Sequence, residues 1–239
     1  MNLRRGGDLG RPLVIGHRGA PARAPENTIA SLRAAVDAGA DIVEFDISPG
    51  LRLGHSLDEL PEEEVTLDDA LEFLGGHDVG LHLDIKLPGY EDGVLEALRR
   101  HRLEDRAYVS TAFALTGRRI AARAPGCTVA IGYPRDRVGI SKLRWPVPLT
   151  RAGAAALRQA MPVRVPVLLR WARANALSLH QTLCSRAAVS VAHRLGAPVL
   201  AWTANDPATV RRLVAAGVDG IVSDDPEMAL ETLATLLAQ

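Results

Sequence analysis

Three carboxylate residues stand at spacings that could build a metal site. Glu44 and Asp46 are two residues apart in the apolar run ADIVEFDIS, and on a strand that spacing puts both side chains on one face. Asp84 lies in a second such run, LHLDIK, and shares its face with His82 and Lys86. Buried carboxylates at close range are costly unless a metal or a lysine neutralises them. Hard oxygen ligands of this kind favour Mg2+ or Ca2+ over zinc.

Other polar side chains follow further apolar runs. His17 and Arg18 end LVIGHR, His180 follows ALSL, Trp202 ends VLAW, and Asp224 follows GIVS. Taken singly, each has an ordinary structural interpretation, such as a salt-bridge partner or a hydrogen-bonded histidine. Their shared position at the ends of apolar runs favours one site instead. The chain has no HxH or HExxH pattern, which argues against a zinc hydrolase.

The elements that must position these residues are short strands. Aliphatic runs alternate with amphipathic helical windows along the chain, a pattern that predicts parallel strands joined by helices. The expected strands are Leu13–His17, Asp41–Ile47, Val79–Lys86, Ala107–Ser110, Thr128–Gly132, Ala176–Leu179, Val199–Thr203 and Gly220–Ser223. Eight such strands form a closed barrel, whose active site lies at the carboxyl ends of the strands. The sequence therefore predicts an α/β fold, a (β/α)8 TIM barrel.

One short run does not fit this alternation. Leu51–His55 follows Ile47 after only Ser48-Pro49-Gly50, too few residues for a parallel crossover. We therefore expect a short antiparallel hairpin after the second strand.

Two helices have clear end signals. Thr28–Ala38 is expected to begin after a cap at Asn27 and to end at Gly39. Pro226–Leu237 carries proline at an early position, where its missing N–H costs nothing. In Arg135–Ala174, by contrast, four prolines (Pro146, Pro148, Pro162 and Pro166) predict a long excursion broken into pieces.

Composition favours one soluble globular domain over residues 1–239. Hydrophobic residues make up 47% and charged residues 23% of the chain, as in ordinary globular domains. A formal net charge of zero predicts no nucleic-acid partner. The polar N-terminus and the absence of about 18–20 consecutive apolar residues predict a cytoplasmic protein. Cys127 and Cys184 are expected to be buried free thiols.

The charge is nevertheless uneven along the chain. Between Arg137 and Asn205 there are nine arginines, one lysine and no acidic residue. This bias has a bland interpretation, a general preference for arginine, and a functional one, attraction of an anionic substrate or an anionic membrane surface. The apolar residues among these bases include Trp145, Leu168, Leu169 and Trp171. We expect them to pack in the helical ring rather than to face a membrane.

The ordered motifs resemble those of the glycerophosphodiester phosphodiesterases, a family of phosphatidylinositol-phosphodiesterase-like TIM barrels. That family shows His-Arg-Gly, Pro-Glu-Asn-Thr, a Glu-x-Asp pair, a later His-Asp, a Glu-x-Lys strand, a Trp-Thr run and a final Gly-Val-Asp-Gly-Ile run. This chain has HRG and PENT within GHRGAPARAPENT, then GADIVEFD, Trp202-Thr203 and GVDGIVSDDP, in that order. The resemblance spans nearly the whole chain except Arg135–Ala174.

The resemblance implies a role for each matching residue. His17 and His55 correspond to the catalytic histidines. Substrate is expected to contact Arg18 and Lys86 through its phosphate and Trp202 through its headgroup. The implied metal ligands are Glu44, Asp46 and Asp84. We interpret His82 as structural, and His77, His101 and His193 as surface residues on helices or loops.

The chain departs from the family pattern at three points. His55 is followed by Ser56 where the family has aspartate, and the hairpin between Asp46 and His55 is shorter than usual. Asp84 replaces glutamate, which shortens this ligand arm by one methylene, or about 1.5 Å.

The residues and the resemblance together predict metal-dependent hydrolysis of a glycerophosphodiester to an alcohol and glycerol phosphate by histidine acid–base catalysis. Either water or a vicinal substrate hydroxyl fits as the nucleophile. The partner is then a small-molecule substrate, and no particular oligomeric state is predicted. One alternative is a lysophospholipase-D-like enzyme that makes peripheral contact with an anionic membrane. Another is an inactive barrel that binds an anionic ligand or a partner.

Overall fold

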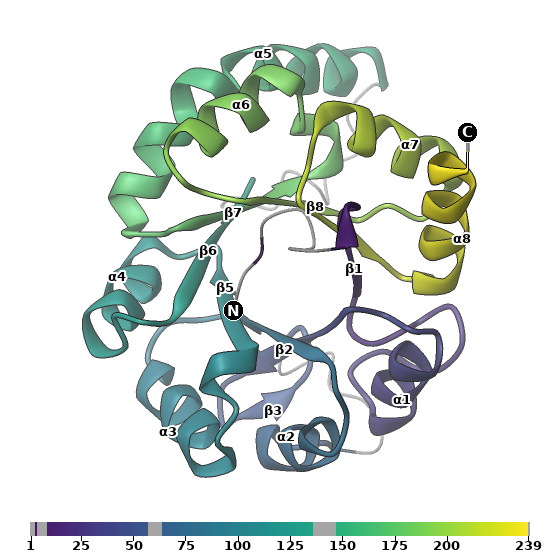
Figure 1. Cartoon of the computed structure of the whole chain (residues 1–239). Helices are drawn as coiled ribbons and strands as arrows, with labels where there is room; N and C mark the ends of the chain where they lie inside the picture. Colours follow the sequence, from purple (N-terminus) through teal and green to yellow (C-terminus); the bar gives the residue numbers. More distant parts are fainter. Residues whose placement is uncertain (1–2, 4–8, 57–63, 136–146, 239) are drawn as a thin grey trace.

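The computed structural model describes residues 3, 9–56, 64–135 and 147–238. Within these residues, eight parallel strands close into a ring, seen end-on in Figure 1. The barrel strands are β1 Leu13–Gly16, β2 Ile42–Ser48, β4 Gly80–Ile85, β5 Ala107–Thr111, β6 Thr128–Tyr133, β7 Ala176–His180, β8 Val199–Trp202 and β9 Gly220–Ser223. Pairing of β1 with both β2 and β9 closes the ring. This confirms the predicted (β/α)8 barrel.

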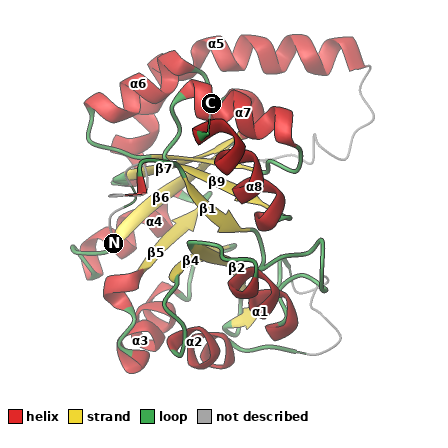
Figure 2. Cartoon of the chain, turned by 45° about the vertical axis from the view of Figure 1, so that its right-hand side comes forward, coloured by secondary structure: helices red, strands yellow, loops and turns green. Residues whose placement is uncertain are grey.

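Helices cover the outside of the barrel, as Figures 1 and 2 show. In the described parts of the chain they are α1 Ile29–Asp37, α2 Leu67–Gly75, α3 Glu91–His101, α4 Ala114–Arg123, α5 Val147–Ala172, α6 Arg186–Arg194, α7 Pro207–Ala216 and α8 Pro226–Leu237. Two short 3-10 turns, Glu104–Arg106 and Gln181–Leu183, lead into β5 and follow β7. The helix between successive strands supplies the crossover that a parallel sheet requires.

The short run after β2 forms the expected hairpin. β3, Arg52–Leu53, pairs antiparallel with the end of β2, with Ile47 opposite Leu53 and Ser48 opposite Arg52. The Ser48 hydroxyl donates a hydrogen bond to the Gly54 carbonyl at 2.5 Å, which ties the two arms together. The chain beyond β3 therefore returns over the end of the second barrel strand.

The barrel interior changes from apolar to charged along its axis. Near the amino ends of the strands, buried apolar side chains fill it: Leu3, Leu13, Ile15, Ile42, Tyr108, Ala130, Ala176, Leu200 and Val222. Toward the carboxyl ends, Glu44 aligns with His82, and Asp46 aligns with Asp84 across β2 and β4. Because side chains alternate between the two faces of a strand, these four point to the inside of the barrel. The charged groups thus rest on an apolar layer.

The start of α1 differs from the prediction. The cap is Thr28, whose hydroxyl accepts a hydrogen bond from the Ser31 amide, whereas Asn27 has a left-handed φ of 59°. The Asn27 side chain instead accepts a hydrogen bond from the Asp46 amide at 2.9 Å. Asn and Thr are both good cap residues, so a long-range contact with β2 decided between them.

The expectation that prolines break Arg135–Ala174 is wrong for α5. This helix runs without interruption over 26 residues and contains Pro162 and Pro166. Pro148 stands at its second position, where proline is tolerated, while Pro146 lies outside the described residues. Buried Met161, Val165, Leu169 and Ala172 anchor the helix to the barrel at helical spacing. Their packing compensates for the backbone hydrogen bonds that the prolines remove.

The apolar residues of this region divide between core and surface. Leu169 is buried, and Leu168 packs partly against the core. Trp171 is 52% exposed, and Trp145 lies outside the described residues. The expected core packing is therefore correct for the two leucines and wrong for Trp171. No helix in the described residues is long and apolar enough to cross a membrane.

The carboxylate of Asp219 links α6 to the sheet. Its side chain is 1% exposed and accepts hydrogen bonds from the Val199 amide at 2.8 Å and from His193 Nε2 at 2.7 Å. We predict that Asp219→Ala lowers the free energy of unfolding by about 1–3 kcal/mol, because it leaves a buried N–H without its acceptor. Urea unfolding at constant pH measures this loss.

Asp92→Ala is the matched control for that measurement. Its carboxylate is 66% exposed in an ion pair with Arg123, and exposed pairs contribute less than about 1 kcal/mol. Equal losses in the two variants would contradict a special role for the buried carboxylate.

Candidate active site

The loop after β1 holds His17 and Arg18 in a fixed conformation. Arg18 has a φ of 53° and Gly19 a φ of 88°, and a Cβ on Gly19 would lie 2.4 Å from the Ser31 carbonyl carbon. The Ser31 hydroxyl donates to the Arg18 carbonyl at 2.9 Å and accepts from the Ala20 amide at the same distance. The first turn of α1 thus clamps this loop, and only glycine fits at position 19.

The three predicted carboxylates meet inside the barrel. Glu44, Asp46 and Asp84 each offer a carboxylate oxygen within 4.8 Å of the others. Glu44 is 3% exposed and Asp46 is fully buried. The register explains the meeting, because Asp46 pairs with Asp84 across β2 and β4 and Glu44 lies one inward position below.

Two basic side chains counter this negative charge. Lys86 Nζ lies 2.7 Å from Asp46 Oδ1 and 2.5 Å from Asp84 Oδ2. Arg18 Nε lies 3.0 Å from Asp46 Oδ2, and the Arg18 amide donates to Glu44 Oε2 at 2.6 Å. The structure thus places both predicted phosphate-binding residues directly against the carboxylates.

These contacts shift the pKa values of the carboxylates and of Lys86 in different directions. Burial, with the charge of Asp46, raises the pKa of Glu44 well above its usual value. Burial would also raise the pKa of Asp46, but Lys86, His55 and Arg18 hold it well below its usual value. Burial opposes the charge of Lys86, yet Asp84 and Asp46 raise its pKa. Glu44 and Asp46 therefore differ in the direction of their pKa shifts although both are buried.

This donor set fits a divalent cation. All three groups are carboxylates, the ligands that Mg2+ and Ca2+ prefer. Burial and the charge of Asp46 raise the pKa of Glu44, and a cation bound there would favour its ionised form. The residues that would hold it are Glu44, Asp46 and Asp84.

The hairpin carries His55 to the same cluster. His55 Nδ1 lies 3.2 Å from Asp46 Oδ2 and 3.0 Å from Arg18 Nη2, and its side chain is 45% exposed. The short hairpin and Ser56 therefore still allow the histidine to reach the cluster from the solvent side.

His17 follows β1 and contacts a different carboxylate. Its Nδ1 lies 2.6 Å from Asp224 Oδ1, and Asp224 also accepts a hydrogen bond from the Asn205 side-chain amide. Because the carboxylate accepts, the His17 Nδ1 carries the proton and Nε2 is left for substrate. The orientation of His17 thus depends on β9, the strand next to β1.

Trp202 lies at the end of β8. It packs partly against the interior apolar cluster, and its ring meets that of His180 edge-on, with centroids 5.1 Å apart. Of the eight predicted site residues, six are joined by direct contacts: Arg18, Glu44, Asp46, His55, Asp84 and Lys86. His17 precedes Arg18 in the chain and contacts Asp224, and Trp202 ends β8.

Several residues without a predicted role contact this cluster or His17. Asp224 orients His17, Glu26 accepts a hydrogen bond from Arg18 Nη1 at 2.6 Å, and Asn27 contacts Asp46 from the loop side. The sequence carried signals for all three, since Asp224 follows an apolar run and Glu26 and Asn27 belong to PENT. Ser110, which donates to Asp84 Oδ1 at 2.5 Å, carried no such signal.

His82 is buried inside the barrel, as expected of a structural histidine. Its ring stacks on Tyr108 with centroids 4.2 Å apart, and burial lowers its pKa to about 3. His77, His101 and His193 lie on or next to helices and are partly exposed.

Comparison with known proteins identifies the family of this chain. The model of the glycerophosphoryl diester phosphodiesterase family matches residues 17–48 and 51–228. A glycerophosphodiester phosphodiesterase from Caldanaerobacter subterraneus is 24% identical over 257 residues, which cover 91% of this chain and 96% of the relative.

Solved structures share the fold. One is a glycerophosphodiester phosphodiesterase from Parabacteroides distasonis, with a TM-score of 0.73, 20% identity and coverage of 95% of this chain and 98% of the other. Another is an Oleispira antarctica phosphodiesterase in complex with its product sn-glycerol-3-phosphate, with a TM-score of 0.72, 22% identity and coverage of 93% and 97%. Because the family model matches most of this chain, the chain belongs to the glycerophosphoryl diester phosphodiesterase family, as its motifs predicted.

Proposed function

We propose that this chain hydrolyses glycerophosphodiesters to an alcohol and glycerol phosphate, with a bound divalent cation and with His17 and His55 as acid–base catalysts. The observation that carries the proposal is the convergence of three carboxylates, two bases and two histidines at the carboxyl ends of β1, β2 and β4. The product complex of the Oleispira relative supports glycerol phosphate as the product.

The bases bind and neutralise the phosphodiester. Arg18 and Lys86 place positive charge beside Asp46, where negative charge on the phosphate oxygens increases during the reaction. When bound, Mg2+ or Ca2+ would supply further neutralisation of those oxygens and acidify a coordinated hydroxyl. Trp202 would form the apolar wall beside the glycerol or headgroup.

The histidines move the protons. His17, held through Nδ1 by Asp224, presents Nε2 to the substrate, and His55 approaches from the hairpin beside Asp46. One histidine removes the proton of the nucleophile, and the other protonates the leaving alkoxide. Because the two approach the cluster from different strands, one can act on each side of a phosphate bound between them.

The presence of this complete set argues against an inactive barrel. An ancestor's site that no longer supports catalysis has no physical reason to keep buried like charges together, since they cost stability. Ser56 and Asp84 depart from the family pattern, but His55 and Asp84 still contact the cluster.

The first prediction concerns the reaction itself. We expect the protein to release glycerol phosphate from glycerophosphocholine or glycerophosphoethanolamine, to lose this activity in EDTA, and to recover it with Mg2+ or Ca2+. Enzymatic detection of glycerol phosphate measures release. Turnover that persists in EDTA would contradict the metal requirement, and no release from either substrate would contradict the proposed reaction.

A second prediction concerns His17. We expect His17→Ala to lower kcat by about 100- to 10,000-fold, because a general acid or base is lost, while the circular dichroism spectrum stays unchanged. His101→Ala is the control, since His101 lies at the end of α3 and hydrogen-bonds to an exposed carboxylate, Asp68. An active His17→Ala enzyme would rule out this catalytic assignment.

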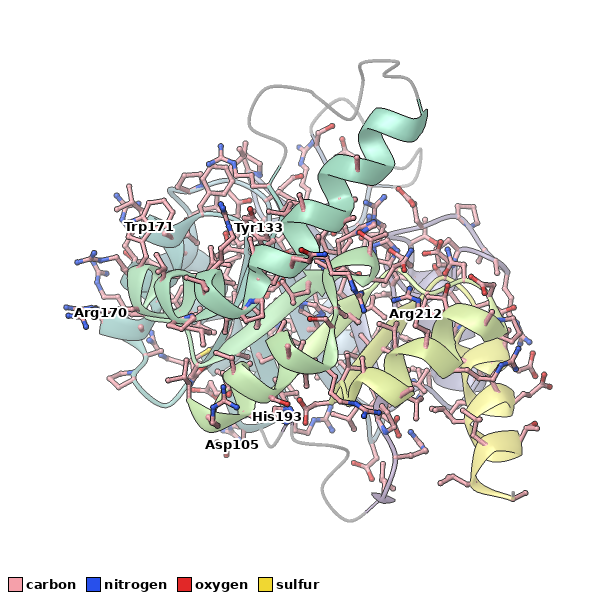
Figure 3. The ribbon with its side chains drawn as sticks, turned by 90° about the horizontal axis from the view of Figure 1, so that it is seen from above. Asp105, Tyr133, Arg170, Trp171, His193 and Arg212 are labelled. Atoms are coloured by element: carbon pink, nitrogen blue, oxygen red, sulfur yellow. The ribbon has the colours of Figure 1, made fainter. Side chains whose placement is uncertain are left out.

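Contact with an anionic membrane is a second candidate function, favoured by the surface of α5. Val163, Val167 and Trp171 are 78%, 63% and 52% exposed, and their four-residue spacing puts them on one helix face. Exposed Arg164, Arg170 and Arg173 flank them, and Figure 3 shows Arg170 and Trp171 on the outer side of the molecule. A basic helix with exposed apolar side chains suits an anionic membrane surface.

Vesicle binding tests this second function. We predict co-sedimentation with vesicles of phosphatidylglycerol and phosphatidylcholine that falls as salt is added, because the charges are screened, and that weakens in Trp171→Ala. Pure phosphatidylcholine vesicles and Leu237→Ala, at an exposed leucine of α8, are the controls. An absence of binding to the anionic vesicles would remove the membrane contact, and with it the basis for a lysophospholipase-D-like activity.

A further inference from the structure

The carboxylate of Asp84 is held on both sides by hydrogen-bonding groups. Lys86 Nζ lies 2.5 Å from Oδ2, and the Ser110 hydroxyl donates to Oδ1 at 2.5 Å. Ser110 lies on β5 directly opposite Asp84 in the strand register and is 3% exposed. Both oxygens therefore have protein partners, which fixes the plane of the carboxylate.

A second buried residue fixes the hydroxyl of Ser110. His82 Nε2 lies 2.7 Å from Ser110 Oγ. A hydroxyl has one proton, and the Ser110 proton is directed to Asp84, so His82 Nε2 must donate to Ser110. The hydrogen bonds thus run in one direction, from His82 to Ser110 to Asp84. This direction is the same whether the imidazole is neutral or charged.

The ring of His82 is itself immobilised. It is 4% exposed and stacks on Tyr108, with the ring planes 21° apart. Tyr108 is fully buried in the apolar layer at the bottom of the barrel. The series of contacts therefore connects the packed core to one carboxylate of the proposed cation site.

Asp84 depends on such support more than a glutamate would. Its side chain is one methylene shorter than the glutamate of the family pattern, so its carboxylate must be oriented more closely toward a cation to reach it. The side chains next to metal ligands usually orient them, and their loss typically weakens metal binding by about 10- to 100-fold.

We propose that Ser110 and His82 are positioning residues that hold the short Asp84 arm toward a divalent cation. The inference rests on the cation site of the proposed function and adds two residues to it. Neither residue touches the substrate or the cation; both act through Asp84.

Metal affinity is the direct test. Calorimetric titration of the metal-free protein with Mg2+ and with Ca2+ is expected to show affinity about 10- to 100-fold weaker in Ser110→Ala than in the unmodified chain. His82→Phe, which keeps a ring against Tyr108 but removes the donor, is expected to show a smaller loss. Ser178→Ala is the control, because Ser178 is a buried serine of β7, on a strand that does not adjoin β4.

Two further measurements separate positioning from a general structural role. Excess cation should restore the kcat of Ser110→Ala, because the defect lies in cation binding. In an Asp84→Glu background, Ser110→Ala should weaken cation affinity by a smaller factor, because the longer arm needs less support. The effects of the two substitutions on affinity would then be non-additive. Ser110→Cys, which keeps the size of the side chain but donates only weakly, should show the same loss of cation affinity should the alanine variant fail to fold.

The outcomes distinguish this inference from the proposed function. Folded Ser110→Ala with cation affinity within twofold of the unmodified chain overturns the positioning role, and hydrolysis by the unmodified enzyme would still support the proposed function. A clear affinity loss without any hydrolysis by the unmodified enzyme would support the positioning pair and overturn the reaction. An unmodified chain that binds neither cation overturns the positioning role as well.

Discussion

The structure of the site depends on one constraint, the repulsion between buried carboxylates on neighbouring strands. The parallel register aligns Asp46 with Asp84 and places Glu44 one inward position below, so the three charges cannot separate without disrupting the sheet. Lys86 and Arg18 counter part of this charge. Burial and the charge of Asp46 still raise the pKa of Glu44, and the divalent cation of the proposed function would favour its ionised form.

The same constraint explains why the surrounding backbone is so closely determined. Arg18 contributes both its amide and its guanidinium to the cluster, which requires the left-handed turn at Arg18 and Gly19. Asn27 adopts a left-handed conformation and hydrogen-bonds to both the amide and the carboxylate of Asp46. The backbone strain in this loop is therefore compensated by contacts with the charged strand that it covers.

Local patterns predicted most of the barrel and the core of the site. Aliphatic runs identified the strands to within one or two residues, and the two-residue spacing of Glu44 and Asp46 identified the inward face. The failures have a common physical cause, contacts between distant segments. Packing on the barrel keeps α5 continuous through Pro162 and Pro166. Thr28 rather than Asn27 caps α1 because β2 engages Asn27.

Residues that support the site were harder to predict than those that form it. The contact of Asp224 with His17 exists only because the last strand closes the ring against the first. Likewise, Ser110 is an unremarkable residue of a buried strand until the register of β4 and β5 sets it opposite Asp84. Catalytic residue types can be recognised from their chemistry, whereas their supports are defined by pairings between strands far apart in the chain.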